Sequence, residues 1–167
     1  MSIIGVRREG LRRTVFVLVP LRVFALCCLA LLGASGYFVI SARYDYAAHF
    51  VAGAGGGLIL LAVFTSAAAV LRVRRSLEPK TADLPVVLAT LTAIGAGIGV
   101  EYLLFGDPSA DLLDIVHQSL GAAFVGLIWT LAPAVPGSVG RVLARASGLV
   151  VLGLVMIAMG AKFVSLF

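Results

Sequence analysis

The sequence predicts an all-α fold, a polytopic bundle of about five transmembrane helices. Hydrophobic residues make up 61% of the 167-residue chain and charged residues 13%, and the mean hydropathy is +1.11. The apolar residues gather in long runs, and ~20 residues suffice to cross a hydrocarbon core of ~30 Å as a helix. We therefore expect one transmembrane domain, residues 14–167, after a basic cytoplasmic N-terminus, residues 1–13.

Five runs meet this length requirement, and each predicts one span. They cover residues 14–40, 46–70, 84–105, 112–134 and 147–167. The adjacent Cys27 and Cys28 of the first run point ~100° apart on a helix and cannot form an ordinary disulfide with each other. We interpret them as packing or lipid-facing residues.

The basic residues predict the orientation, because they concentrate on alternate connections in the positive-inside pattern. They are Arg7, Arg8, Arg12 and Arg13 before the first span, Arg72, Arg74, Arg75 and Lys80 after the second, and Arg141 and Arg145 after the fourth. We therefore expect a multi-pass protein of the cytoplasmic (inner) membrane with its N-terminus cytoplasmic and its C-terminus extracytoplasmic. A basic start, an apolar run and the small residues 33–36 also resemble a cleaved signal peptide, and this alternative stays open.

The second span begins with two polar residues. Asp45 and His49 are four apart, so they share one helix face ~6 Å apart along the axis. Gly53, Gly56 and Gly57 continue this face, and Gly53 and Gly57 have the G-x-x-x-G spacing that lets membrane helices approach closely. The pattern predicts a polar end followed by a tight helix contact.

The third and fourth spans repeat this arrangement. Glu101 lies near the end of the third span, with Gly97 one turn below it. The fourth span opens with polar residues that fall within a ~120° arc of the helix, namely Asp111, Asp114, His117 and Gln118. Asp111 and Asp107 also fit the role of ordinary helix caps at the membrane interface.

Together these patterns predict that the second, third and fourth spans pack through glycines and form the core of the bundle, while the first and fifth are peripheral. Their polar ends would then converge on a pocket at the outer leaflet. Charged groups in hydrocarbon cost at least ~2.5–3.5 kcal/mol each, which favours a functional role. The candidate ligand-binding residues are Asp45, His49, Glu101, Asp114, His117 and Gln118. A purely structural polar knot is the alternative.

The polar residues carry a family resemblance. Asp45-x-x-x-His49-Phe50, Glu101-Tyr102-Leu103 and the run from Pro108 through Asp111, Asp114 and Gln118 to Gly121-Ala122 resemble the motifs of the VanZ-like family of small bacterial membrane proteins. The resemblance covers about residues 45–126. The chain departs from the family pattern at Tyr46 (Lys in the family), Leu104 (Gln) and Gln118 (Asn), and it lacks an Arg near the proline.

The family is named after a protein associated with resistance to the glycopeptide antibiotic teicoplanin. The resemblance therefore implies a role at the cell envelope, in handling or masking a surface lipid or an antibiotic target, and it implies no established reaction. The first hypothesis is a non-enzymatic envelope protein whose partners are membrane lipids and a lipid-like or glycopeptide ligand. A homo-oligomer is left open.

Two other functions stay open. A membrane-embedded metal or acid–base enzyme acting on a lipid would use His49, Glu101, Asp114 and His117, which are suitable metal ligands. No H-E-x-x-H, P-loop or serine-elbow motif accompanies them, so no cofactor is assigned. The third function is a small ion- or proton-coupled transporter. No nucleic-acid partner is expected. The net charge is +5, but the basic residues lie beside the membrane spans and do not form a basic surface on a soluble domain.

Overall fold

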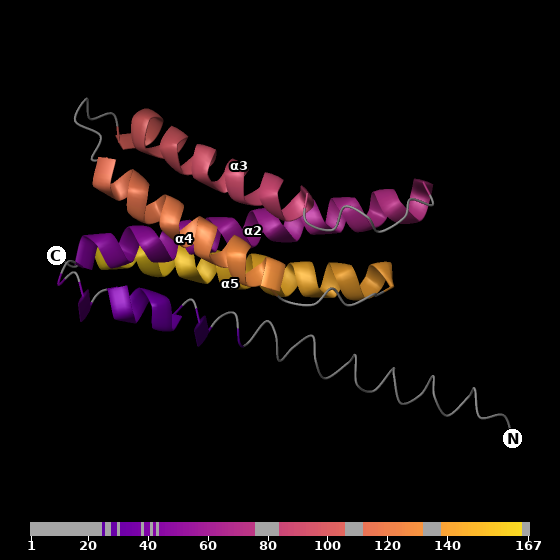
Figure 1. The fold of residues 1–167 in the computed structure, drawn as a ribbon, viewed down its shortest axis with the longest axis horizontal. Coiled ribbons are helices and arrows are strands. Elements are labelled where there is room, and N and C mark those ends of the chain that lie inside the picture. The colour runs from indigo at the N-terminus through magenta and orange to yellow at the C-terminus, as the bar shows by residue number, and fades with distance from the viewer. Residues whose placement is uncertain are drawn as a thin grey trace, which may run out of the picture.

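The computed structural model describes residues 25, 28–29, 31–37, 39–40, 42, 44–75, 84–105, 112–131 and 138–164. Within these ranges the protein is an all-α bundle of long helices (Figure 1). The order is α2 (Tyr44–Arg75), α3 (Leu84–Val100), the π-helical turn η1 (Glu101–Phe105), α4 (Leu112–Leu131) and α5 (Val139–Val164). Most of the first expected span, with Cys27, lies outside the described residues.

The predicted third and fourth spans agree closely with the helices, but the helices of the second and fifth spans extend further than predicted. α2 continues to Arg75, and α5 begins at Val139 instead of residue 147. The arginines that we expected in connections therefore lie on helices: Arg72, Arg74 and Arg75 on α2, and Arg141 and Arg145 on α5. An arginine can lie on a membrane helix because its long side chain can carry the charged group towards the membrane surface. A helix can therefore continue past the end of its apolar run.

The start of α5 is fixed by Ser138. Its carbonyl oxygen accepts hydrogen bonds from the backbone N–H groups of Arg141 and Val142, at 3.0 and 3.1 Å. The Arg141 side chain also donates from Nε to the Ser138 hydroxyl at 3.4 Å. These contacts close the first turn of the helix, so the chain turns helical well before the apolar run begins.

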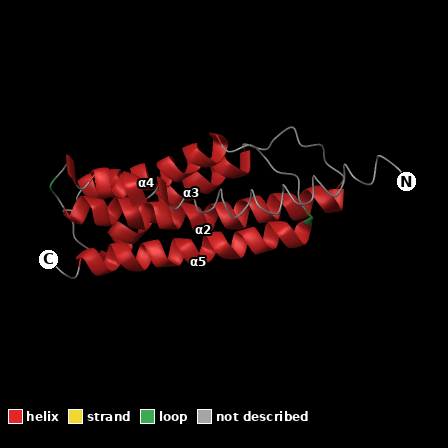
Figure 2. Cartoon of the chain, turned by 90° about the horizontal axis from the view of Figure 1, so that it is seen from below, coloured by secondary structure: helices red, strands yellow, loops and turns green. Residues whose placement is uncertain are grey.

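α2 occupies the centre of the bundle and contacts α3, α4 and α5. It runs parallel to α4, because Gly53 lies against Gln118 and Gly57 against Ala122. It runs antiparallel to α5, because Gly55 meets Gly153 and Ala48 meets Gly160 (Figure 2). The starts of α2 and α4 and the ends of η1 and α5 therefore lie together, and we call this the polar end of the bundle (Figure 1).

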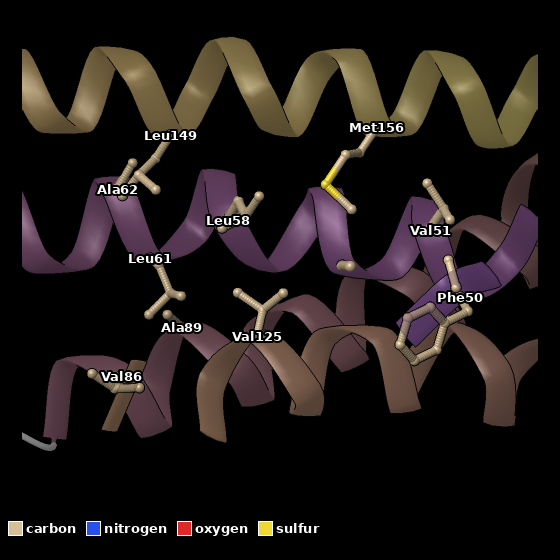
Figure 3. Packing of buried hydrophobic residues seen from close by; sticks show 12 residues of the cluster. Phe50, Val51, Leu58, Leu61, Ala62, Val86, Ala89, Val125, Leu149 and Met156 are labelled. Atoms are coloured by element: carbon tan, nitrogen blue, oxygen red, sulfur yellow. The ribbon is translucent and has the colours of Figure 1, made fainter. Parts of the chain in front are cut away.

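The expectation that the fifth span is peripheral is wrong, because α5 packs along α2. A Cβ on Gly153 would lie 2.6 Å from the Gly55 carbonyl oxygen, so the two backbones are nearly in contact. Leu149 and Met156 of α5 are fully buried against α2 (Figure 3). Packing between small residues needs no polar group, so the polar faces of the sequence do not indicate this contact.

The buried core lies on both sides of α2. Its residues come from all four long helices and from the first segment: Ala34, Phe50, Val51, Ala54, Leu58, Leu61, Ala62, Val86, Ala89, Val125, Leu149 and Met156. Figure 3 shows Leu58 and Leu61 of α2 between α5 on one side and Val86 and Val125 on the other. The buried acidic and imidazole side chains, Glu101 and His117, lie outside this apolar core, at the polar end.

Four of the described helices are long and apolar enough to cross a membrane: Tyr44–Arg72, Leu84–Leu103, Leu112–Thr130 and Val139–Lys162. Large apolar side chains such as Leu91, Leu127 and Val151 face outwards on them. Exposed apolar surface on this scale is unfavourable in water and favourable in lipid. The chain is a multi-pass integral membrane protein.

Candidate functional site

The structure brings three of the candidate residues together at the polar end. The His49 ring lies between two carboxylates, with Nδ1 3.7 Å from Glu101 Oε1 and Nε2 3.4 Å from Asp114 Oδ2. Each residue comes from a different helical element, so the contact depends on the tertiary fold. We call this group the His49 cluster (His49, Glu101 and Asp114).

Close packing of α2 on α4 positions two members of the cluster. Gly53 follows His49 by one turn, and a Cβ added to it would overlap the backbone carbonyl of Gln118, one turn after Asp114. Gly121 makes a reciprocal contact with the carbonyl of Phe50. Only glycine allows backbones to approach so closely, and this approach places His49 within reach of Asp114.

The third member is positioned by a change of helix type. α3 ends at Val100, and Glu101 opens the π-helical turn η1. π-helical turns are rare and frequently occur at functional sites. One turn earlier, Gly97 leaves room for the Gln118 side chain, whose Nε2 atom would lie 2.6 Å from an added Cβ. α3 and α4 therefore also approach closely beside the cluster.

The cluster is largely removed from solvent. The Glu101 side chain is 10% exposed, the His49 side chain 20% and the Asp114 side chain 23%. Burying a carboxylate is costly unless it is paired, and protonated His49 would lie beside both carboxylates and offset one of their two charges. One imidazolium cannot neutralise two carboxylates, so the fully ionised cluster carries a net negative charge.

His117 lies outside these ion pairs, in an aromatic environment. It is 5% exposed, its ring stacks on Tyr46 at a centroid distance of 4.2 Å, and the Tyr37 ring approaches at 4.9 Å in an edge-on orientation. His117 Nδ1 donates a hydrogen bond to the Leu113 carbonyl oxygen. This bond places a proton on Nδ1 and holds the ring against its own helix.

Tyr37 and Tyr46 are not among the site residues predicted from the sequence. Tyr46 lies three residues before His49 on α2, and this spacing could have placed it beside the cluster. Tyr37 carried no such signal, because its contact with His117 and its stacking on Phe50, at 5.7 Å, arise from tertiary packing.

The remaining candidates occupy different surroundings. Gln118 is partly buried on α4, with its amide beside Gly97. Asp45 lies in the first turn of α2 and is partly exposed, a position where the helix dipole favours a carboxylate. Asp111 and Asp107 lie outside the described residues.

A metal site was one interpretation of these residue types. Within the described parts of the chain, no group of three or more His, Cys, Asp or Glu side chains is placed to hold a metal ion. His117, the fourth ligand suggested by the sequence, faces Tyr37 and Tyr46. What the His49 cluster can do chemically is to attract a positive charge and to exchange protons between an imidazole and two carboxylates.

The chain was compared with family models, with curated proteins and with solved structures, and none of the three comparisons found a match.

Proposed function

We propose that this chain is a non-enzymatic membrane protein of the cell envelope, of the VanZ-like type, whose His49 cluster binds the headgroup of a lipid or another amphiphile. The observation that supports this proposal most directly is the position of His49 between Glu101 and Asp114. Ionisable side chains inside membrane-spanning helices are costly and mark functional sites by default. An apolar contact would join these helices at lower cost.

The resemblance to the VanZ-like family supports the same residues. His49 belongs to the first motif, Glu101 to the second and Asp114 to the third. These motifs are far apart in sequence, and the carboxylates of Glu101 and Asp114 lie 3.7 and 3.4 Å from the two ring nitrogens of His49. Three separate motifs that meet at one place are more consistent with a shared site than with three independent helix caps.

The orientation favours a ligand from the outer leaflet. With the N-terminus in the cytoplasm, as the basic residues predict, the starts of α2 and α4 lie at the extracytoplasmic surface. The His49 cluster would then face lipids of the outer leaflet of the inner membrane and amphiphilic antibiotics that reach it from outside.

Lipid retention by the purified protein tests the binding. Wild-type protein and the E101Q/D114N variant would be extracted in mild detergent and their bound lipids counted by native mass spectrometry. We expect the variant to retain fewer lipids, because it loses both negative charges while keeping nearly the same shape. S147A is the matched control, since Ser147 is exposed on α5 and, among the described residues, its hydroxyl donates to the Leu143 carbonyl oxygen of its own helix. Equal retention by all three proteins would overturn the proposal.

The envelope role has a separate test. A deletion strain of the source organism should change its susceptibility to lipoglycopeptides, and wild-type protein should restore it while E101Q/D114N should not. Unchanged susceptibility in the deletion strain, together with unchanged lipid retention in the variant, would leave the proposed function without support.

A further inference from the structure

The end of the bundle opposite the polar end is rich in arginine, and we call it the basic end. The arginines of the described helices are Arg72, Arg74 and Arg75 near the end of α2, and Arg141 and Arg145 near the start of α5. The acidic residues of the described ranges all lie at the polar end: Asp45, Glu101 and Asp114. Because α2 and α5 are antiparallel, both groups of arginines lie at the basic end, where the described helices supply no carboxylate.

The charge of the sequence on this side is also strongly positive. The positive-inside pattern places the N-terminal segment and the connections after the second and fourth spans on one side of the membrane. These parts carry the ten basic residues of that pattern and three acidic residues, Glu9, Glu78 and Asp83. A partner of this end should therefore be negatively charged.

Arg145 lies further into its helix than the other described arginines. It belongs to the segment Val139–Lys162, which is long and apolar enough to cross a membrane, and its guanidinium lies 4.8 Å from the centroid of the Trp129 ring. In the part of the chain that the structure describes, no carboxylate pairs with it. A cation–π contact attracts a positive charge but does not neutralise it. A charged side chain in a membrane span marks a binding site by default, and the partner that this one lacks is an anion.

Trp129 places the guanidinium at the depth of lipid headgroups. The ring lies near the end of α4, ~22 Å from Asp114 along the helix, and tryptophan is enriched where the hydrocarbon core meets the headgroups. The planar N–H groups of an arginine match the oxygens of a phosphate. Arg145 therefore combines the depth and the donor geometry that a lipid phosphate requires.

Arg141 adds a second positive charge on the same side of α5. It precedes Arg145 by four residues, a spacing at which two like charges repel each other on a helix. Among the described residues its side chain contacts the neutral hydroxyl of Ser138, with Nε 3.4 Å from Oγ. An anion beside the two guanidinium groups would convert this repulsion into attraction.

We propose that Arg145 and Arg141 bind the phosphate of an anionic phospholipid, whose headgroup lies beside Trp129 and whose acyl chains follow the outward apolar surface of α4 and α5. Leu127 of α4 and Leu143 of α5 are exposed near this end and provide such a surface. Basic sites between membrane helices on the cytoplasmic side bind anionic headgroups in this way. The site is at the opposite end from the His49 cluster, so the inference does not depend on the proposed function.

Tryptophan fluorescence tests this site directly, because Trp129 is the single tryptophan of the chain. Full-length protein would be reconstituted in phosphatidylcholine vesicles that contain a small, equal fraction of a lipid with brominated acyl chains, either phosphatidylglycerol or phosphatidylcholine. Bromine quenches tryptophan on contact. We expect brominated phosphatidylglycerol to occupy the site roughly fivefold more strongly, the ratio expected from one arginine at a membrane surface. Equal quenching by the two lipids would overturn the inference from the wild-type protein alone.

The variants locate the preference. R145Q and R141Q/R145Q should bring the quenching ratio close to one, with the emission of each variant normalised to its value in unbrominated lipid. K162Q is the matched control, because it removes one positive charge from the last turn of the same helix, and it should keep the wild-type ratio. A preference that survives R141Q/R145Q would reflect a general attraction by the basic end and would also overturn the inference.

A free anion could supply the same phosphate chemistry. Millimolar inorganic phosphate should leave the quenching ratio unchanged when chloride holds the ionic strength constant, because a free ion lacks the acyl chains that retain a lipid beside Trp129. Loss of the ratio in phosphate but not in chloride would identify a small anion as the occupant and exclude the lipid. Higher ionic strength should lower the wild-type ratio, and a ratio that does not respond to salt would contradict binding through the two arginines.

Discussion

Gly53 of α2 lies directly against the backbone of Gln118 of α4, so closely that a Cβ on Gly53 would overlap the Gln118 carbonyl group. One turn earlier on each helix stand His49 and Asp114, whose side chains are 3.4 Å apart. The backbone contact therefore sets the distance across the His49 cluster. A substitution that disturbs this backbone contact should therefore change both the stability of the protein and the geometry of the His49 cluster.

Alanine at Gly53 should destabilise the protein. The added methyl group would meet backbone atoms that cannot move aside, and overpacking of this kind costs ~1–3 kcal/mol. The matched control is G56A on the same helix, because a Cβ there meets nothing within 4 Å and alanine favours the helix by up to ~1 kcal/mol. Reversible unfolding in detergent measures both free energies. Equal values for the two variants would contradict the close approach of α2 and α4.

The contact between α2 and α5 makes an independent prediction. G153A should also destabilise by ~1–3 kcal/mol, because its Cβ would lie 2.6 Å from the Gly55 carbonyl oxygen. G148A on the same helix should be neutral or slightly stabilising, since nothing lies within 4 Å of its Cβ. The same unfolding measurement applies. A peripheral α5 would give the same small effect at both positions.

The positions of the helices and of the polar end could be predicted from the sequence, whereas the packing of α5 on α2 could not. Apolar runs located the helices, and the polar residues His49, Glu101 and Asp114 identified the end where three of them meet, because charged groups in lipid have few favourable positions. The central place of α2 against α5 was missed. Hydropathy does not distinguish an apolar face that meets lipid from one that meets another helix, and Gly153 is recognisable as a contact only once Gly55 is placed opposite it.

The site was only partly predictable for a related reason. The helical step placed His117 on the same arc as Asp114 but could not show that Tyr37 and Tyr46 would enclose it. The helical step relates residues of one helix, whereas these aromatic contacts join three segments. Residue type alone suggested a metal ligand, and the ring contacts indicate a packing role.

Removal of the His49 ring should expose repulsion between its two neighbours. In H49L, the Glu101 and Asp114 carboxylates lose the group that lies between them, and breaking a buried pair costs up to ~3–5 kcal/mol, with less expected here because His49 is partly exposed. Adding E101Q to H49L should recover part of this loss, because one negative charge is removed. A double-mutant cycle on unfolding free energies measures the coupling. Strictly additive effects would argue against electrostatic pairing in the cluster.

Cysteine labelling should reveal the orientation. In a chain whose Cys27 and Cys28 are replaced by serine, L112C at the start of α4 should react with a membrane-impermeant maleimide added outside intact cells. S138C before α5 should react only after the membrane is opened. Both positions are exposed and lie at opposite ends of the bundle. The reverse pattern would place the His49 cluster at the cytoplasmic surface and remove the argument for an outer-leaflet ligand.

The Arg145 guanidinium lies over the Trp129 ring, 4.8 Å from its centroid, and joins α5 to α4. Cation–π contacts contribute ~0.5–2 kcal/mol depending on their exposure, so R145Q should destabilise the protein within that range. Trp129 is the single tryptophan of the chain, and its fluorescence should shift in R145Q because the adjacent positive charge is lost. R141Q is the control, since the Arg141 side chain contacts Ser138 instead. If both variants leave the emission spectrum unchanged, the guanidinium does not rest on the ring in the folded protein, and the packing of α4 against the start of α5 would have to depend on apolar contacts alone.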